Sequence, residues 1–114
     1  MENVQVDFLV AFLDGMVYAL TGLALLKWPP KGTNRMYGYR TPRAMKTQES
    51  WDYSQPYASR KIILWGLILL GLAFLTYILA PKNVRGQAFI WVAIILAHVM
   101  PIIQTELQLK RLFG

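Results

Sequence analysis

The sequence predicts an all-α membrane protein with three transmembrane helices and a short cytoplasmic interfacial helix in the first loop. Hydrophobic residues make up 55% of the 114 residues, above the roughly 45–50% of soluble domains. They gather into three runs, each near the ~20 residues that cross a bilayer core. We expect a single transmembrane domain over residues 1–114, with spans at about 7–27, 60–80 and 87–106 and a cytoplasmic loop at about 28–59.

The first span lies in the apolar run from Phe8 to Leu26, which Asp14 interrupts. Its leader, MENVQVD, is acidic where a signal peptide has a basic region, so we expect the span to be retained. A polar stripe, spaced for one helical face, is predicted to point into the bundle; it consists of Asp7, Asp14, Tyr18 and Thr21. Small residues beside it permit close approach by another helix; they are Gly15, Ala19 and Gly22.

Asp14 needs a partner, because an acidic side chain at membrane depth is costly and usually faces protein or water. His98 on the third span is the obvious candidate. Counted from the outer side at ~1.5 Å per residue, Asp14 lies about 10 Å deep and His98 about 17 Å deep, so they miss by about one turn. Tyr18 is level with His98, and a relay through it or a bridging water is therefore expected. Such a cluster is either a proton or ligand pocket or a polar contact that locks two helices.

The predicted loop begins where Pro29 and Pro30 stop the first helix. Thr41 and Pro42 form a strong helix start, with the threonine as cap and the proline in the first helical position. The predicted interfacial helix, about Pro42 to Ser54, places Trp51 against either the headgroups or the bundle end. Pro56 is expected to break this helix before the second span.

The second span, Ile62 to Ala80, contains no charge and is expected mainly to contact lipid. The sequence KNVRG then makes a short hairpin, so the second and third spans should be antiparallel neighbours. The third run, Ala88 to Ile103, holds His98, and Glu106 follows at its inner end. Glu106 lies on the same side of the membrane as the loop, so it is expected either to pair with a loop arginine and tie the loop to the bundle or to be a solvated helix-end charge. The candidate arginines are Arg35, Arg40 and Arg43.

Charge predicts the orientation. The net charge is +6, and most of the 12 basic residues lie in or beside the first loop or after the third span. The positive-inside rule places the N-terminus outside and the first loop and C-terminus in the cytoplasm. The basic charge lies at membrane edges, where anionic lipid explains it, so nucleic-acid binding is not expected. Cysteine is absent and one histidine is present, so no metal or cofactor site is predicted.

The loop sequence NRMYGYRTPRAMKTQESWDY resembles the signature of the SdpI family, bacterial membrane proteins named for immunity to a secreted sporulation-delaying toxin. The resembling residues are Asn34, Tyr37, Gly38, Arg40, Thr41, Pro42, Lys46, Glu49 and Trp51. The end of the third span also resembles the family, at Pro101, Thr105, Glu106 and Leu109. The resemblance implies a multi-span helical protein of the bacterial inner membrane. In the founding member it implies toxin immunity and signalling through a membrane-recruited repressor. This chain is shorter and resembles mainly the C-terminal, signature-bearing part.

Three functional hypotheses follow. The first is a non-enzymatic immunity or interaction protein whose loop docks a peptide toxin, a cytoplasmic regulator or anionic headgroups. Its basic docking residues would be Arg35, Arg40, Arg43 and Lys46, with Tyr37, Tyr39 and Trp51 adding stacked area.

The second hypothesis is a small intramembrane hydrolase of a lipid or membrane peptide. Glu106 would act as general base, Arg40 or Tyr37 would stabilise an anionic intermediate, and Asn34 would add a donor. No known hydrolase motif supports it. The third is a proton-coupled transporter, built as a homo-oligomer around Asp14 and His98.

Overall fold

The computed structural model describes residues 2–34, 36–79 and 84–114 and contains three helices. They are α1 (Glu2–Lys27), α2 (Gln48–Leu79) and α3 (Val84–Phe113). All three are long and apolar enough to cross a membrane, and no strand occurs in the described ranges. The predicted all-α membrane fold with three spans is confirmed. Arg35 and part of the expected hairpin at residues 82–86 lie outside the described residues.

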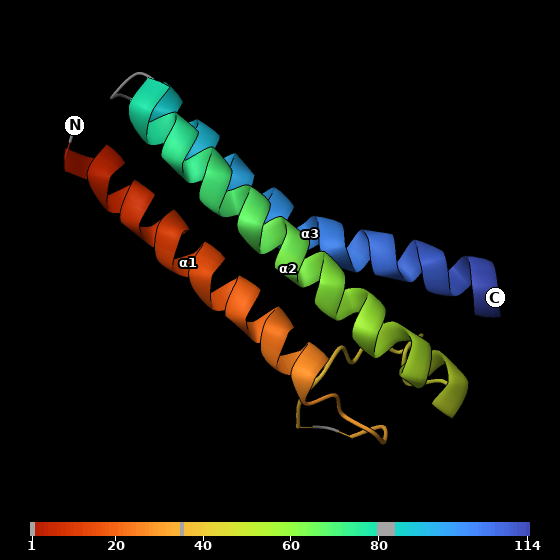
Figure 1. Ribbon diagram of the computed structural model, residues 1–114. Coiled ribbons are helices and arrows are strands. Elements are labelled where there is room, and N and C mark those ends of the chain that lie inside the picture. The colour runs from red at the N-terminus through yellow and green to blue at the C-terminus, as the bar shows by residue number, and fades with distance from the viewer. Residues whose placement is uncertain (1, 35, 80–83) are drawn as a thin grey trace.

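The helices run in alternating directions (Figure 1). The start of α1, the end of α2 and the start of α3 lie at one end of the molecule. The end of α1, the first loop, the start of α2 and the C-terminal end of α3 lie toward the other. α2 packs against both other helices. The loop is therefore close to the one end of the bundle at which α2 begins and α3 finishes.

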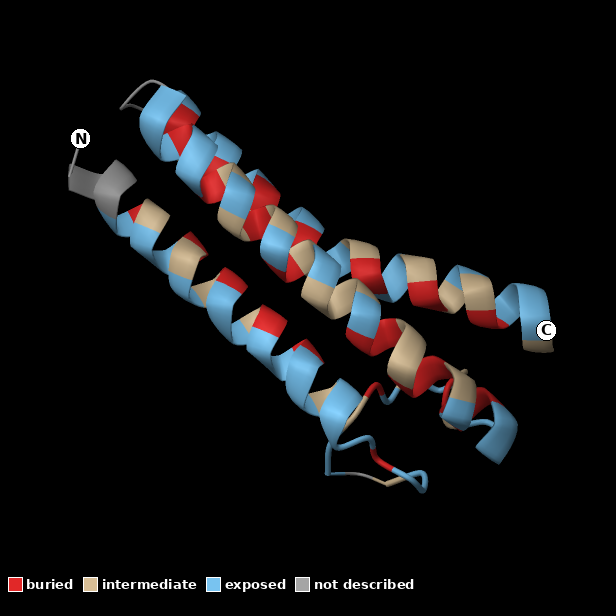
Figure 2. Cartoon of the chain, in the orientation of Figure 1, coloured by how far each residue is buried: buried red, intermediate tan, exposed pale blue. Residues whose placement is uncertain are grey.

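The core of the spans is built mainly from alanine. Its buried residues are Ala11, Leu69, Ala73, Ile90, Ala93 and Ala97. In Figure 2 the buried residues of α1 lie mostly on the side that faces the other helices, and its outward side is exposed. Large apolar residues such as Leu13 and Val17 are exposed on that outer side. This distribution suits helices that contact lipid outside and one another through alanine inside.

The glycines at the α1–α2 contact leave no room for a side chain. A Cβ on Gly22 would lie 2.8 Å from the carbonyl oxygen of Ser59. One on Gly66 would lie 2.8 Å from the backbone nitrogen of Ala19. The close approach expected along Gly15, Ala19 and Gly22 is therefore made with α2 of the same chain. This row is not open to a second copy.

The polar stripe of α1 is only partly directed inward. Asp7 is buried, whereas Thr21 is exposed and its hydroxyl donates a hydrogen bond to the Val17 carbonyl, at 2.7 Å. The prediction was therefore wrong for Thr21. A threonine can satisfy its hydroxyl on the preceding helical turn, so it needs no polar partner in the bundle.

The short interfacial helix is not confirmed, because residues 42–45 form a turn, residues 46 and 47 are not helical, and α2 begins at Gln48. Thr41 does cap a turn, since its Oγ1 accepts the N–H of Ala44 at 3.2 Å. A stronger start follows at Thr47: its Oγ1 accepts the N–H of Ser50 at 3.0 Å, while the Ser50 hydroxyl accepts the N–H of Thr47 at 3.1 Å. This reciprocal capping box fixes the helix start six residues later than predicted.

The predicted break at Pro56 is wrong, because α2 continues through it. Proline within a helix costs about 3 kcal/mol. Buried residues on both sides, among them Trp51, Gln55 and Ala58, hold the first turns of α2 against the rest of the molecule. The Ser59 hydroxyl also donates to the Gln55 carbonyl at 2.6 Å. Tertiary packing thus outweighs the local preference of proline.

Candidate functional site

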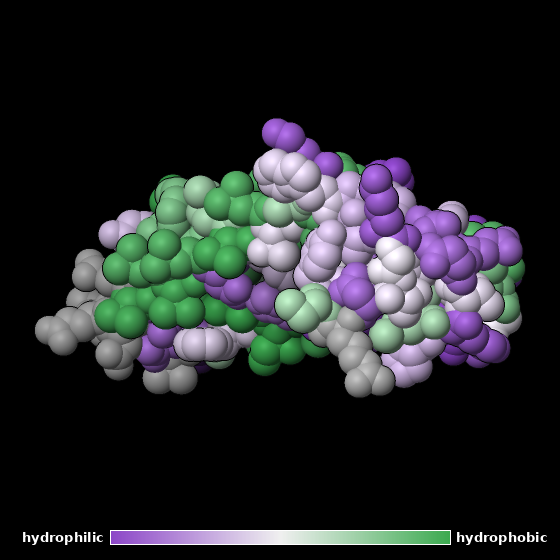
Figure 3. Space-filling model, turned by 90° about the horizontal axis from the view of Figure 1, so that it is seen from below, coloured by the Kyte–Doolittle hydropathy of each residue, from purple (hydrophilic) through white to green (hydrophobic). Residues whose placement is uncertain are grey.

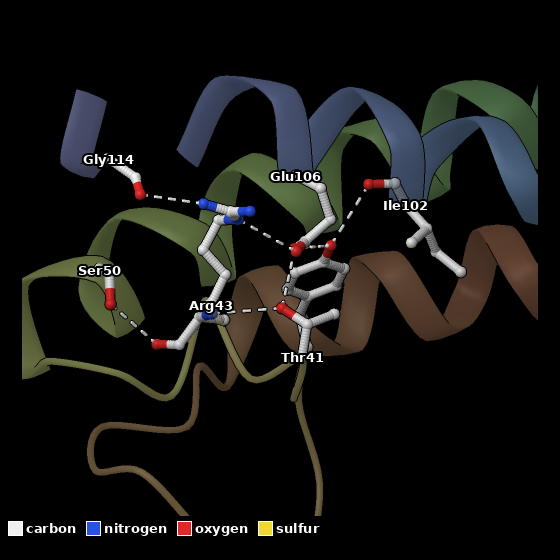
Figure 4. Close-up of polar contacts among 8 residues, drawn as sticks. Thr41, Arg43, Ser50, Ile102, Glu106 and Gly114 are labelled. Carbon is white, nitrogen blue, oxygen red and sulfur yellow. Dashed lines mark hydrogen bonds and ion pairs between the residues drawn. The ribbon is translucent and has the colours of Figure 1, made fainter. Parts of the chain in front are cut away.

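Glu106 joins the loop to α3 through a group that we name the loop anchor: Tyr39, Thr41, Arg43 and Glu106. The Tyr39 and Thr41 hydroxyls donate to Glu106 Oε2 at 2.6 and 2.8 Å. Arg43 Nε lies 3.6 Å from Glu106 Oε1, and its Nη1 donates to the Gly114 carbonyl at 3.1 Å. Figure 4 shows the Glu106 carboxylate directed toward Thr41 and Arg43. Arg43 is one of the three candidate arginines, so the expected arginine–carboxylate pair is present.

Tyr39 is held in its neutral, donating form. Burial, followed by the hydrogen bond to Glu106 and the charge of that carboxylate, raises the pKa of the Tyr39 hydroxyl far above its ordinary value. The hydroxyl also lies 3.4 Å from the Ile102 carbonyl oxygen. A neutral phenol beside a carboxylate is a strong, charge-assisted hydrogen-bond pair.

The backbone of Tyr39 is held by Gln55, a side chain that no pattern in the sequence singled out. Its Oε1 accepts the Tyr39 N–H at 2.8 Å, and its Nε2 donates to the Tyr39 carbonyl at 2.8 Å. The preceding residue, Gly38, has φ +110°. A Cβ there would lie 2.7 Å from Gln55 Oε1 and 2.8 Å from Pro30 Cγ. Gly38 is thus required both for its backbone conformation and for the contact with Gln55.

Trp51 connects the end of α1 to α2. Its side chain is fully buried, and its Nε1 donates to the Pro30 carbonyl at 2.7 Å. Of the two positions expected for Trp51, the headgroups or the bundle end, the indole occupies the bundle end. Because it is buried there, it adds no exposed area to a docking surface on the loop. Ala44, Ala58, Leu109 and Tyr39 form a second buried cluster at this end.

The remaining loop residues of the predicted site are turned outward. Asn34 shapes a turn, because its Oδ1 accepts the N–H groups of Met36 and Tyr37 at 2.8 and 2.9 Å and its Nδ2 donates to the Gly32 carbonyl. Within the described part of the chain, the Asn34 side-chain amide makes hydrogen bonds only inside this turn, so it does not contact Glu106.

We name the exposed residues Met36, Tyr37, Arg40 and Lys46 the loop face. Glu49, also exposed, lies in the first turn of α2, where a carboxylate is favourable.

The surface divides in the same way. Figure 3 shows hydrophobic surface over the part of the molecule formed by the spans and more hydrophilic surface toward the opposite end. The average hydrophobicity of the whole chain does not show that its hydrophobic and hydrophilic surfaces lie at opposite ends. A polar, basic end on an apolar bundle is the pattern of a protein that meets water or headgroups there.

The intramembrane cluster is closer than predicted. His98 Nε2 lies 2.9 and 2.8 Å from the two carboxylate oxygens of Asp14, and the Tyr18 ring centroid lies 4.3 Å from that of His98. The expected relay through Tyr18 or a water was wrong, because the pair is direct. Counting residues from the span ends assumes untilted helices that start at the same level, so it does not give the relative depth of two side chains. No group of three or more potential metal-ligating side chains occurs among the described residues.

Comparison with known proteins agrees with the loop signature. The model of the SdpI/YfhL protein family matches residues 31–105. Over 67 residues the chain is 33% identical to the uncharacterized protein YfhL of Bacillus subtilis (strain 168). This match covers 59% of the chain and 61% of that relative, less than two thirds of its length. No solved structure is significantly similar. Because the family match covers more than half of the sequence, including every loop residue of the anchor, this chain belongs to the SdpI/YfhL family.

Proposed function

We propose that the chain is a non-enzymatic immunity or interaction protein of the bacterial inner membrane. Its loop face docks an acidic partner, either a peptide toxin or a cytoplasmic regulator. The N-terminus is outside, and the loop and C-terminus are cytoplasmic, as the distribution of basic residues favours. Family membership and three span-like helices support the membrane and immunity parts of this proposal.

The observation that carries the proposal is the loop anchor. Two loop hydroxyls donate hydrogen bonds to one carboxylate of α3, and Arg43 forms an ion pair with it. Gln55 holds the loop backbone from α2. A loop fastened to two helices presents its outer side chains in a fixed arrangement. Preorganisation of this kind reduces the ordering cost of binding.

The loop face has the composition of a binding surface. Arg40 and Lys46 carry positive charge, and Tyr37 and Met36 expose 47% and 84% of their surface. Arginine and tyrosine are enriched among residues that dominate binding energy. Positive charge steers an acidic partner toward the surface and speeds its association.

The same geometry disfavours the hydrolase. A general base needs an oxygen that reaches a substrate proton. Glu106 Oε2 already accepts two hydroxyl hydrogen bonds, and Oε1 faces Arg43. Its neighbours are thus those of a structural carboxylate.

An immunity assay tests the proposal. Cells expressing the chain, and cells with an empty vector, are exposed to a secreted membrane-active peptide toxin, and survival is counted. We expect protection that is lost in the double variant Arg40→Ala, Lys46→Ala and kept in Lys110→Ala, which removes a cation of α3 that does not belong to the loop face. Membrane abundance of each variant is measured alongside by immunoblot.

Two results would overturn it. Equal killing with and without the chain removes the immunity role. Protection unaffected by the double variant removes the loop face from the mechanism. Turnover of a lipid or membrane peptide that is abolished in Glu106→Gln, with the protein still folded, would favour the hydrolase instead.

A further inference from the structure

A groove of about 300 Å³ lies between the end of α1 and the first turns of α2. Leu25, Leu26 and Pro29 line one side, and Gln55 and Pro56 line the other. Its volume is at the lower end of small-molecule sites, which are concave and mostly apolar with a few polar groups. The loop anchor and the loop face do not use this groove.

The groove is placed where acyl chains meet headgroups. Leu26 is 39% exposed and Trp28 is 63% exposed, and Lys27 Nζ lies 4.9 Å from the centroid of the Trp28 ring. Tryptophan and lysine at the end of a span mark the membrane interface. An occupant of this groove therefore has one end in hydrocarbon and the other among headgroups.

Two opposite charges line the polar part of the groove, Lys31 and Asp52. Gln48 joins the chain at Lys31 to the first turns of α2, because its Nε2 donates to Asp52 Oδ1 at 2.7 Å and to the Lys31 carbonyl at 2.9 Å. No ion pair joins these two described side chains to each other. The ammonium of Lys31 and the carboxylate of Asp52 thus complement a ligand that carries one negative and one positive group.

We propose that this groove binds a phospholipid with a primary-amine headgroup, of the phosphatidylethanolamine class. The upper part of one acyl chain lies against Leu25, Leu26 and Pro29. The phosphate pairs with Lys31, and the ammonium pairs with Asp52. A purely anionic headgroup meets the Asp52 carboxylate without a compensating cation, and a trimethylated amine lacks the N–H donors that a carboxylate accepts.

Lipid retention by the purified full chain tests this site. The protein is extracted in mild detergent and offered phosphatidylethanolamine, phosphatidylglycerol or phosphatidylcholine of identical acyl chains, and bound lipid is counted by native mass spectrometry. We expect phosphatidylethanolamine to be retained best. Asp52→Asn lowers its preference over phosphatidylglycerol by roughly threefold to fivefold, the scale of a partly exposed ion pair. Lys31→Gln weakens retention of both lipids.

Matched controls lie outside the groove. Glu49→Gln removes a carboxylate one turn before Asp52, and Lys110→Gln removes a cation on α3; both should leave retention unchanged. Leu26→Trp, at an already exposed position, fills the groove and should reduce retention of all three lipids while the helical circular dichroism stays as in the parent.

The proposal is overturned by equal retention of the three lipids, or by a preference that survives Asp52→Asn. It is also overturned if a photo-crosslinker at position 26 captures a second copy or a peptide in native membranes and no lipid. None of these outcomes depends on the docking role of the loop face, because the variants lie outside it.

Discussion

The loop anchor and the Asp14–His98 pair both join a carboxylate to residues far away in the sequence, but they are built differently. Glu106 accepts two hydroxyl hydrogen bonds and faces an arginine, whereas Asp14 contacts one imidazole. A loop without regular structure has to be held by several contacts. The helices are already held by packing along their length. The Asp14–His98 pair therefore fixes how α1 and α3 are aligned along their axes and adds little stability.

Removing the buried indole beneath the loop should have the largest effect. Trp51→Ala leaves a cavity and an unpaired Pro30 carbonyl, and we expect a loss of about 3–5 kcal/mol in the free energy of unfolding. Unfolding in mixed micelles, followed by circular dichroism, measures it. Trp28→Ala, at an exposed position, is the matched control and should cost less than about 0.5 kcal/mol. Equal losses would show that the loop end has no core of its own.

Neutralising the central carboxylate of the loop anchor should come next. Glu106→Gln keeps the shape but replaces one acceptor oxygen by an NH₂ group and removes the charge facing Arg43. We expect a loss of about 1.5–3 kcal/mol, as for hydrogen bonds to a charged group. Limited proteolysis at the loop arginines and lysines reports loosening directly. Glu49→Gln serves as control, and unchanged proteolysis of Glu106→Gln would contradict the anchor.

Tyr39→Phe isolates one hydroxyl of the same anchor and should cost about 1 kcal/mol at neutral pH. The folded chain holds the Tyr39 proton more tightly than the unfolded chain, whose pKa is near 10.0. The stability that this proton provides is therefore complete below that pH and falls as the pH rises above it. Unfolding followed from about pH 8 to about pH 11 should show a smaller alkaline loss in Tyr39→Phe than in Tyr37→Phe. If stability falls equally with rising pH in both variants, the alkaline loss does not come from the Tyr39 hydroxyl.

The smallest effect is expected inside the membrane. A double-mutant cycle of Asp14→Asn and His98→Gln should give a coupling of about 0.6 kcal/mol, and no more than about 1.7, as for other polar contacts between membrane helices. A coupling above that of the Glu106–Arg43 pair would reverse the comparison between the two clusters. If Asp14→Asn also abolished proton flux in vesicles, the transporter hypothesis would gain support.

The spans were predictable because a bilayer imposes length and composition on each helix separately. Ile62 to Leu79 needs no knowledge of its neighbours to be recognised as apolar. The family, too, could be recognised from local residues, since the signature from Asn34 to Trp51 is continuous in the sequence. Both predictions depend on features that lie within a short, continuous stretch of the sequence.

What the sequence did not reveal depends on neighbours. The helix start at Gln48 was missed because two caps, Thr41 and Thr47, compete, and the second is strengthened by Ser50. Gln55 gave no signal, because an amide on a helix beside Pro56 has no preferred partner until the loop is placed. The Asp14–His98 contact was missed because relative helix height is a property of the packed bundle.

The length of α2 has a consequence for access. Its 32 residues make a rod of about 48 Å, against a hydrocarbon thickness of about 30 Å and about 40–45 Å with both headgroup layers. With Leu79 at the far boundary of the hydrocarbon, Gln55 lies about 36 Å along the rod, at the outer edge of the near headgroup layer, and Trp51 lies about 42 Å along it, just beyond that layer. The first loop is therefore held at the water-facing edge of the headgroups. A water-soluble protein can reach it there without entering the hydrocarbon.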